Sequence, residues 1–307
     1  MTAVRRYEAS MYDSNRWDGF ELRPGDIIIS TPPKCGTTWT QMICALLILQ
    51  EPELPLPLDT LSPWIDMVTR ARTDVFADLE AQTHRRFIKT HTPLDGIPID
   101  PLATYIVMAR HPLDMAVSLY HQGNNINRER LRELTGQPVS SGPDQSVKPR
   151  RPVQDWLLSW IDSDDRPADE MDSLPGVLWH LSDAWARRDQ SNIVLMHYDD
   201  LSADLSGQMH RLAALLDITV PQEIWPSLVR SATFAQMRAS ASQGAPDPAG
   251  VLKDPAAFFR RGSSGAGREV LSAEELAHYC ERAAQLASPE LLAWLHREPD
   301  MPAAGRG

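Results

Sequence analysis

One short segment holds residues that could bind an anion: positions 31 to 38 read Thr-Pro-Pro-Lys-Cys-Gly-Thr-Thr. Lys34 supplies a cation, and Thr37 and Thr38 supply two hydroxyl groups. A short β-prone run precedes the segment and a long apolar run without a helix breaker follows it, which predicts a strand, a tight loop and a helix. The N–H groups of the first helical turn point at whatever lies before the helix. The segment therefore predicts an anion site of the kind that binds phosphate.

Other segments would place this loop in a sheet. Residues 86–91, 104–110 and 192–198 are short strand candidates, and each is followed by a turn or a helical pattern. Pro112 stands where a helix would begin, and apolar residues then recur at helical spacing. This alternation predicts an α/β fold with a central parallel sheet flanked by helices. In it, Arg110 ends a strand and Ser118 lies on the helix that follows.

The remaining segments give weaker signals. We expect a polar lead-in over residues 1–25, a helix over 153–161 and a single helix over 202–216. Ser272 and Glu275 form a capping box that opens a terminal helix, and the tail from Pro299 is expected to fray. No composition shift marks a second domain. We therefore predict one domain over residues 1–307, with a core at about 23–298 and a variable insertion at 124–175.

A proline-rich segment follows the first helix. Four prolines between Pro52 and Pro63 argue against a regular helix or a central strand, so we expect a long loop. This loop carries apolar residues that would either line a substrate cavity or pack against the body of the protein: Trp64, Ile65, Met67 and Val68.

Composition limits the possible partners. A net charge of −11 over 307 residues argues against nucleic acid, because that interaction needs an extensive basic surface. No apolar run is long enough to span a bilayer, so we expect a cytoplasmic protein with no membrane partner. The three cysteines are an odd number without metal-ligand spacing, which supports neither a disulfide framework nor a zinc site. Several lysines and arginines lie within the short motifs described below. A few such cations close together are enough to bind a small polyanion.

The loop differs from the Walker A motif, in which a lysine directly follows the second glycine. Here Lys34 precedes Gly36 by two residues, and Asp199 is the only carboxylate near the end of a predicted strand. A nucleoside triphosphatase would need an acidic residue at the end of a strand to hold magnesium. The loop and the strand ends therefore both argue against that class. A plain capped turn is also disfavoured, since capping alone requires neither the lysine nor the paired threonines.

Five segments in this order resemble one family. The run from Arg23 to Trp39 resembles the 5′-phosphosulfate loop of cytosolic-type sulfotransferases, which use 3′-phosphoadenosine 5′-phosphosulfate (PAPS). The segments IKTHTPL, ARHPLDMAVSLYH, LMHYDDL and FFRRGSSGAGR resemble further motifs of the family. The resemblance spans residues 23 to 268, and five ordered motifs are more specific than any one of them.

The resemblance implies a role for each matching position. The residues implied to hold the 5′-phosphosulfate are Lys34, Cys35, Gly36, Thr37 and Thr38, with Trp39 near the adenine. The residues implied to bind the 3′-phosphate are Arg110, Ser118, Arg260, Arg261 and Gly262. Tyr198 and Phe234 match adenine contacts, although either could equally be a core aromatic. His91 matches the general base, and Lys89 would stabilise the transferring group from the side opposite Lys34. No metal is required when lysines supply the positive charge.

Two positions depart from the family pattern. Arg268 stands where the family has lysine, which keeps the charge but changes the donor geometry. Cys35 replaces the commoner serine. At a helix N-terminus its thiolate would be stabilised, which predicts sensitivity to oxidation. The dimerisation element of many eukaryotic members is not recognisable after Gly267, so the sequence leaves the oligomeric state open.

The implied activity is transfer of a sulfuryl group from PAPS to a hydroxyl or amine of a small-molecule acceptor. We expect the acceptor pocket to come from residues 52–68, 118–122 and 124–175, and the acceptor itself is not specified by the sequence. Two alternatives remain at this stage: a small-molecule or nucleotide kinase that uses the same loop for ATP, and a nucleotide-binding module without catalytic activity.

Overall fold

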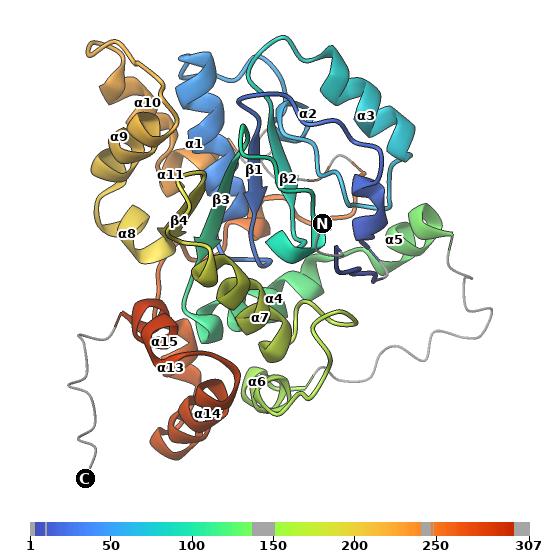
Figure 1. Ribbon diagram of the computed structural model, residues 1–307. Coiled ribbons are helices and arrows are strands. Elements are labelled where there is room, and N and C mark those ends of the chain that lie inside the picture. Colours follow the sequence, from blue (N-terminus) through green and yellow to red (C-terminus); the bar gives the residue numbers. More distant parts are fainter. Residues whose placement is uncertain (1–3, 10, 137–150, 241–246, 248, 298–307) are drawn as a thin grey trace.

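Four parallel strands form the centre of the molecule. The structure is a computed structural model that describes residues 4–9, 11–136, 151–240, 247 and 249–297. The strands are β1 (Ile27–Ser30), β2 (Phe87–Thr90), β3 (Thr104–Ala109) and β4 (Ile193–His197), in the order β2-β1-β3-β4. Every predicted strand is present, and the predicted α/β class with a central parallel sheet is confirmed (Figure 1).

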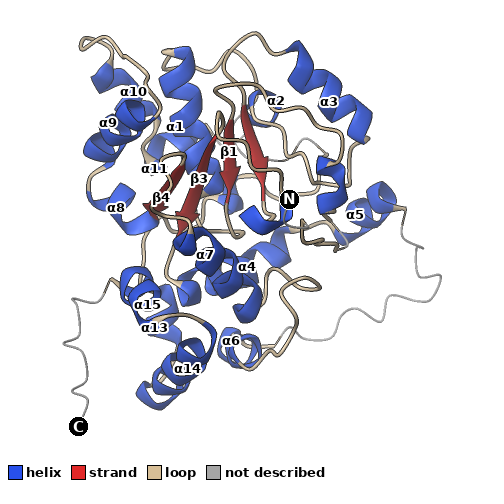
Figure 2. Cartoon of the chain, in the orientation of Figure 1, coloured by secondary structure: helices blue, strands red, loops and turns tan. Residues whose placement is uncertain are grey.

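Helices cover both faces of the sheet (Figure 2). Those before β4 are η1 (Ser14–Trp17), α1 (Thr37–Leu49), α2 (Leu58–Leu61), α3 (Arg72–Ala81), η2 (Leu94–Gly96), α4 (Pro112–Asn125), α5 (Arg128–Thr135), α6 (Val153–Ile161) and α7 (Leu174–Ala186). Those after β4 are α8 (Tyr198–Ala203), α9 (Leu205–Leu215), α10 (Trp225–Ser231), α11 (Phe234–Ala239), η3 (Ala256–Phe258), α13 (Ala266–Val270), α14 (Ala273–Leu286) and α15 (Pro289–His296).

Alternate residues of each strand enter two different cores. Ile28 and Ile88 pack with apolar residues of α4, α6, α7 and α14 on one face. Ile27, Ile29 and Phe87 pack with α1, α9 and α10 on the other. Successive side chains of a strand point to opposite faces, so strands that are apolar throughout need a helical layer on each side. This explains why β1, β3 and β4 are nearly continuous apolar runs.

Several helix predictions need correction. The single helix expected over 202–216 is two helices, because the Asp204 carboxylate accepts a hydrogen bond from Gly207 N at 2.8 Å and starts α9. The Ser272 and Glu275 capping box is confirmed, but α14 is followed by a second helix, α15, which Ser288 caps. In the proline-rich loop one helical turn, α2, follows Pro57. The expectation of no helix there was wrong because Pro57 stands at the N-cap, where a proline costs little.

The N-terminal segment is not merely a polar lead-in. Tyr7, Tyr12 and Trp17 are buried, and Tyr12 forms an isolated bridge with Met67 of the proline-rich loop. In the 124–175 region α4 runs to Asn125, and α5 and α6 follow, while residues 137–150 lie outside the described residues, as does the tail beyond Arg297. The prediction of one domain over the whole chain stays a prediction.

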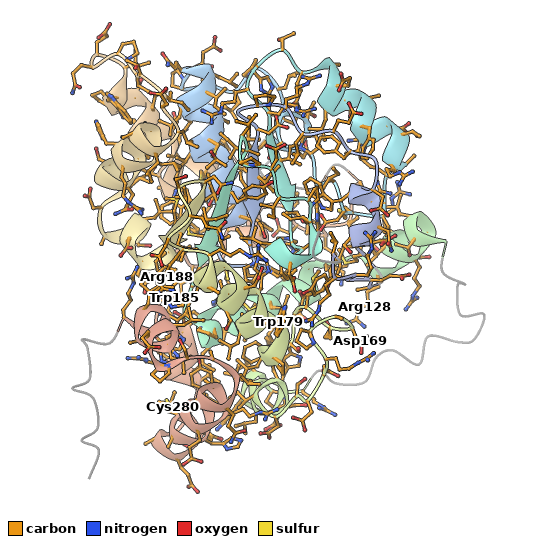
Figure 3. The ribbon with its side chains drawn as sticks, in the orientation of Figure 1. Arg128, Asp169, Trp179, Trp185, Arg188 and Cys280 are labelled. Carbon is orange, nitrogen blue, oxygen red and sulfur yellow. The ribbon has the colours of Figure 1, made fainter. Side chains whose placement is uncertain are left out.

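Side chains at the C-terminal end pack α15 onto α7. The Trp185 and Trp294 rings are 5.3 Å apart, and the Arg188 guanidinium lies 4.7 Å from the Trp185 ring (Figure 3). Cys280 is exposed on α14, whereas Cys35 and Cys44 are buried, and none of the three forms a disulfide. Among the described helices, none has the length and apolar character needed to cross a membrane.

Candidate active site

A cavity of about 250 Å³ opens at the carboxyl ends of the strands. Ligands of open α/β sheets commonly bind at this edge. All but one of the predicted site residues line the cavity, namely Lys34, Gly36, Thr37, Thr38, Trp39, Lys89, His91, Arg110, Ser118, Tyr198, Phe234, Arg260, Arg261 and Gly262. Residues that are 228 positions apart in the chain thus meet in one site.

The loop between β1 and α1 has an unusual backbone. Lys34 has φ 62° and Gly36 has φ 113°, so both occupy the left-handed region. Gly36 is the N-cap of α1 and no side chain caps the helix there, which leaves the first-turn N–H groups available to an anion. A Cβ at position 36 would lie 3.2 Å from the Tyr198 ring. The loop therefore favours glycine and presents amide groups to the cavity.

Two lysines line the cavity, and neither forms an ion pair with a carboxylate in the part of the chain that the structure describes. The Lys34 Nζ lies 3.8 Å from the Phe258 ring and 3.4 Å from the Gln122 Oε1. The Lys89 Nζ lies 3.9 Å from the Trp64 ring. Burial, followed by repulsion from neighbouring cations, lowers the pKa of Lys34 to about 7. Burial lowers the pKa of Lys89 to about 8. Both pKa values would rise beside a bound anion.

His91 follows β2 directly and is 6% exposed. Its Nδ1 lies 2.7 Å from the carbonyl oxygen of Thr31, which can only accept, so Nδ1 carries the proton and Nε2 has a free lone pair. The Trp64 ring packs edge-on against the imidazole, with ring centroids 4.6 Å apart. Burial first, and then the charge of Lys89, hold the pKa of His91 well below its ordinary value. The imidazole is therefore neutral and able to accept a proton.

Arg110 lies at the opposite side of the loop. Its Nη2 donates to the carbonyl oxygen of Ser263 at 2.9 Å, and its guanidinium lies 4.1 Å from the Tyr198 ring. Its Nε is buried and has no hydrogen-bond partner among the described residues. A buried donor without an acceptor is costly unless a ligand completes it, which fits a phosphate.

Aromatic rings surround this end of the cavity. The Trp39 Nε1 donates to the Ala232 carbonyl oxygen at 2.8 Å, and the Trp39 ring lies 5.2 Å from the Tyr198 ring. Gly262 has φ 69°, and a Cβ there would come within 2.6 Å of the Phe234 ring. These rings fit an adenine base, as the resemblance implied, although their contact with one stays a prediction.

The two arginines of the 260–262 segment differ in their partners. Burial, and repulsion from Arg261 and Arg110, lower the pKa of Arg260. No carboxylate of the described residues lies within ion-pair distance of Arg260. By contrast, the Arg261 guanidinium forms two 2.6 Å hydrogen bonds with Glu269. Arg260 is thus the better placed of the two for a ligand phosphate.

The Cys35 side chain lies away from the cavity, and its thiol is not activated as the sequence suggested. Its side chain is fully buried in the core and does not line the cavity, so only its backbone could face a ligand. Burial raises the pKa of its thiol to about 12. Burial and the raised pKa argue against the predicted thiolate, because desolvation of the thiolate outweighs the helix N-terminus, and the predicted sensitivity to oxidation stays a prediction.

The glycine-rich segment is fixed to α4. The Asp114 carboxylate accepts hydrogen bonds from Gly265 N and Gly267 N, both at 2.8 Å. A Cβ at position 267 would come within 2.3 Å of Leu113. Arg268, the residue that departs from the family pattern, does not line the cavity.

Sequence reasoning missed three polar residues near the site. Asp66 accepts hydrogen bonds from the Thr90 and Thr92 hydroxyls at 2.7 and 2.6 Å, which fixes the strand end before His91. Tyr12 and Asp172 line the cavity itself. Asp172 lies in an acidic run in which no carboxylate stands out by sequence, and Tyr12 lies in a segment without a recognisable motif.

In the described ranges there is no group of three or more histidine, cysteine, aspartate or glutamate residues that could hold a metal ion. The expectation that the reaction needs no metal stays a prediction.

Comparison with known proteins agrees with the fold and the motifs. The family model described as "Sulfotransferase domain" matches residues 24–288. A glycolipid sulfotransferase of Mycobacterium bovis is 39% identical over 305 residues, covering 94% of this chain and 93% of that protein. Its counterpart from Mycobacterium tuberculosis H37Rv is 40% identical over 304 residues, with the same coverage.

Solved structures share the fold. The mouse sulfotransferase SULT7A1 complexed with PAP has a TM-score of 0.67 at 19% identity and covers 93% of each chain. A retinol dehydratase in complex with androsterone and PAP has a TM-score of 0.66 at 19% identity, covering 90% of this chain and 84% of that one. The chain therefore belongs to the sulfotransferase family, and the enzyme class predicted from its sequence, a PAPS-dependent sulfotransferase, is confirmed.

Proposed function

We propose that this cavity binds PAPS and transfers its sulfuryl group to a hydroxyl of an amphiphilic small molecule, with His91 as the general base. One observation carries the proposal. Lys34, Lys89, Arg110 and Arg260 line one cavity, and no carboxylate among the described residues forms an ion pair with any of them. Lys89 and Arg110 are buried, and buried like charges are costly unless a ligand of opposite charge joins them.

The residues fit a nucleotide with phosphates at two positions. Lys34, the Gly36 backbone and the Thr37 and Thr38 hydroxyls would hold the 5′-phosphosulfate, as the glycine cradle and the first-turn N–H groups of α1 suggest. Arg110, Ser118 and Arg260 would hold the 3′-phosphate. The unpaired Nε of Arg110 supports this assignment. PAPS supplies an electrophilic sulfur and a phosphate leaving group.

His91 and Lys89 would act on the acceptor. The neutral Nε2 of His91 accepts the hydroxyl proton as the acceptor oxygen forms its bond to sulfur. The ammonium groups of Lys34 and Lys89 stabilise the negative charge that develops on the transferring group and its leaving oxygen. A bound anion beside Lys89 also reduces the repulsion that lowers the pKa of His91, which makes the imidazole a stronger base.

The acceptor class follows from the other walls. Apolar residues dominate the part of the cavity away from the phosphate loop: Met11, Trp64, Met67, Leu119, Ile126, Val251 and Leu252. Such walls suit a hydrocarbon chain or ring beside the reacting hydroxyl. The relatives at 39–40% identity are named as glycolipid sulfotransferases, and we extend that acceptor type, an amphiphile with a sugar head, to this chain.

Two measurements test the proposal. Calorimetric titration should show tighter binding of adenosine 3′,5′-bisphosphate (PAP) than of ATP with magnesium, and the reverse order would favour a kinase. Incubation with labelled PAPS and a panel of alkyl glycosides should give labelled product. Tight PAP binding without product over the whole panel would favour a silent nucleotide-binding module. A cytoplasmic location and the lack of nucleic-acid and membrane partners remain predictions.

A further inference from the structure

Two acidic side chains line a cavity that is otherwise rich in cations: Asp247, whose carboxylate accepts hydrogen bonds from the backbone N–H groups of Val251 and Leu252, and Asp172. Asp172 lies between α6 and α7, and its carboxyl group lies near the hydroxyl of Tyr12, which lowers the pKa of Asp172 against the larger rise that burial causes. The peptide carbonyl of Asp172 accepts a 2.7 Å hydrogen bond from the Trp160 indole N–H, which holds the turn in place. The side chain is thus positioned from two separate parts of the chain.

One oxygen of the Asp172 carboxyl group lacks a hydrogen-bond donor among the described residues. This oxygen is Oδ1, which is buried. A buried oxygen left without a donor costs free energy comparable to a lost hydrogen bond. No described side chain of the site supplies that donor, so a ligand group with an O–H or N–H would complete it.

The location places this oxygen on the acceptor side. Tyr12 packs in one cluster with Met171, Met11 and Trp64. The Trp64 ring in turn contacts the His91 imidazole edge-on. A group held by Asp172 and Tyr12 therefore lies beyond Trp64, away from the nucleotide end that Arg110 and Tyr198 define.

The protonation state of Asp172 limits the groups that it can bind. Burial first, and then the negative charge of Glu170, raise the pKa of Asp172 to about 7. At neutral pH the carboxyl group is present in both protonation states. A hydroxyl can pair with either state, since it can donate to a carboxylate or accept from a carboxylic acid, whereas an ammonium group pairs only with the carboxylate.

We propose that Asp172, positioned by Tyr12, binds a second hydroxyl of the acceptor and so selects acceptors that carry more than one hydroxyl on an apolar body. The inference rests on the proposed function, because it assumes that this half of the cavity receives the acceptor. It goes further in naming the residue that would distinguish a sugar-headed amphiphile from a simple alcohol. His91 would then act on a hydroxyl whose position Asp172 has fixed.

The test compares two probes on the PAP-loaded protein. Calorimetry measures binding of n-octyl β-D-glucoside and of 1-octanol, which share the alkyl chain and differ in the number of hydroxyl groups. The wild type should bind the glucoside more tightly. Asp172→Ala should weaken glucoside binding about tenfold, the effect expected for one lost hydrogen bond to a buried polar group, and leave 1-octanol binding unchanged.

Further variants keep the test decisive if Asp172→Ala is poorly folded. Asp172→Asn keeps an acceptor oxygen and should retain most of the preference for the glucoside, and Tyr12→Phe should lose part of it. Asp169→Ala is the matched control, since Asp169 (labelled in Figure 3) lies in the same loop between α6 and α7. Its carboxylate pairs with the exposed Arg166. PAP affinity should be the same in all of these variants.

Three results would overturn the inference: equal binding of the two probes by the wild type, equal loss of both in Asp172→Ala, or tighter binding of n-octylamine than of the glucoside. These results are separate from failure of the proposed function. That failure would appear as absent PAP binding or absent sulfuryl transfer by the wild type, and the two probes can still be compared without PAP.

Discussion

The two ends of β1 and β2 both carry buried charge, but in opposite ways. Asp26 and Arg86 stand immediately before these strands, Lys34 lies in the loop after β1, and Lys89 lies one residue before the end of β2. Both groups are removed from water. At the amino end each charge meets a partner, whereas at the carboxyl end the cations meet one another.

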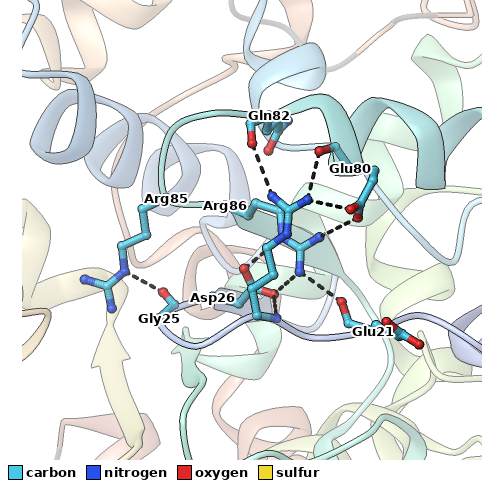
Figure 4. A network of polar contacts seen from close by, with 8 residues as sticks. Glu21, Gly25, Asp26, Glu80, Gln82, Arg85 and Arg86 are labelled. Atoms are coloured by element: carbon cyan, nitrogen blue, oxygen red, sulfur yellow. Dashed lines mark hydrogen bonds and ion pairs between the residues drawn. The ribbon is translucent and has the colours of Figure 1, made fainter.

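The amino end forms a paired network (Figure 4). Arg86 donates to both carboxylate oxygens of Asp26, at 2.8 and 2.5 Å, and to the carbonyl oxygen of Glu21 at 3.0 Å. Arg86 is 1% exposed and Asp26 is 2% exposed. Backbone N–H of Arg23 also donates to Asp26, at 2.8 Å. A buried pair with this geometry can offset its desolvation cost.

The carboxyl end lacks such pairing. Burial and mutual repulsion lower the pKa values of Lys34 and Arg260, and burial alone lowers that of Lys89 despite the nearby Asp66. The comparison teaches that burial by itself does not mark a functional charge. What distinguishes the cavity is that its charges require a group from outside the chain.

The largest expected effect is at His91. Because its Nε2 is the only imidazole nitrogen that we place at the reacting hydroxyl, His91→Ala should lower kcat by about 10²- to 10⁴-fold, the usual contribution of a general base. PAP affinity and the free energy of unfolding should change little. The measurement is turnover with labelled PAPS, with PAP calorimetry on the same preparation.

His278→Ala is the matched control for this change, since His278 lies on the surface of α14 and pairs with Asp162. It should leave kcat unchanged. Normal turnover by the His91 variant would remove His91 from the catalytic role and would leave the lysines as the main source of catalysis.

The next largest effect is expected for the buried Arg86–Asp26 pair at the amino end of the strands. Arg86→Met leaves the Asp26 carboxylate buried without its partner, so the free energy of unfolding should fall by about 3–5 kcal/mol. Chemical denaturation measures it. The double variant Arg86→Met with Asp26→Leu removes both charges and should recover a large part of the loss. A single variant within about 1 kcal/mol of wild type would show that the pair is not structural.

Replacing Arg110 should have the reverse effect of replacing Arg86: it should weaken PAP binding and leave the stability of the fold nearly unchanged. Arg110→Met removes one cation from a group of like charges, so the free energy of unfolding should stay within about 1 kcal/mol of wild type. PAP affinity should fall about 10- to 100-fold, because hydrogen bonds to a charged group are lost. Arg188→Met, on the exposed Arg188 near Trp185, should leave the affinity unchanged. If Arg110→Met instead destabilises the fold as strongly as Arg86→Met, the contrast between the two ends fails.

Local signals explain which parts of the fold the sequence predicted. The strands and α1, α4 and α6 follow from uninterrupted apolar runs, from Pro112 at a helix start and from clear spacing. Helix α3 was missed because it buries only Val75 and Leu79, which leaves too little periodicity to detect. The buried Tyr12 was missed because its burial depends on Met67, 55 residues away.

The same distinction applies to the site residues: those in local motifs were predicted, and those positioned by distant packing were not. His91, Arg110 and the loop around Lys34 were predicted because their motifs are local and ordered. The burial of the Cys35 side chain was not predicted, because the direction of a side chain and its desolvation depend on packing rather than on sequence. Asp172 was not predicted, since its partner Tyr12 is 160 positions away and its acidic neighbours are indistinguishable from it by sequence.

The smallest expected effect is the pH dependence of PAP binding. In the free protein the pKa of Lys34 is about 7 and that of Lys89 is about 8, and a bound phosphate would raise both. Binding then takes up protons between these pKa values and the raised values of the complex. Affinity should be greatest at or below pH 7 and fall by about tenfold between pH 7 and pH 8, because part of the binding free energy goes to protonating the lysines.

Calorimetry in buffers of different ionisation enthalpy measures this proton uptake directly. Lys34→Met should reduce both the uptake and the slope of affinity against pH, because one of the two titrating groups is gone. The paired amino end offers no such response to the ligand. Constant affinity from pH 7 to pH 9 would mean that the lysines are already fully charged in the free protein, and hence that the cavity does not hold its cations in the unsatisfied state that sets it apart from the Arg86 network.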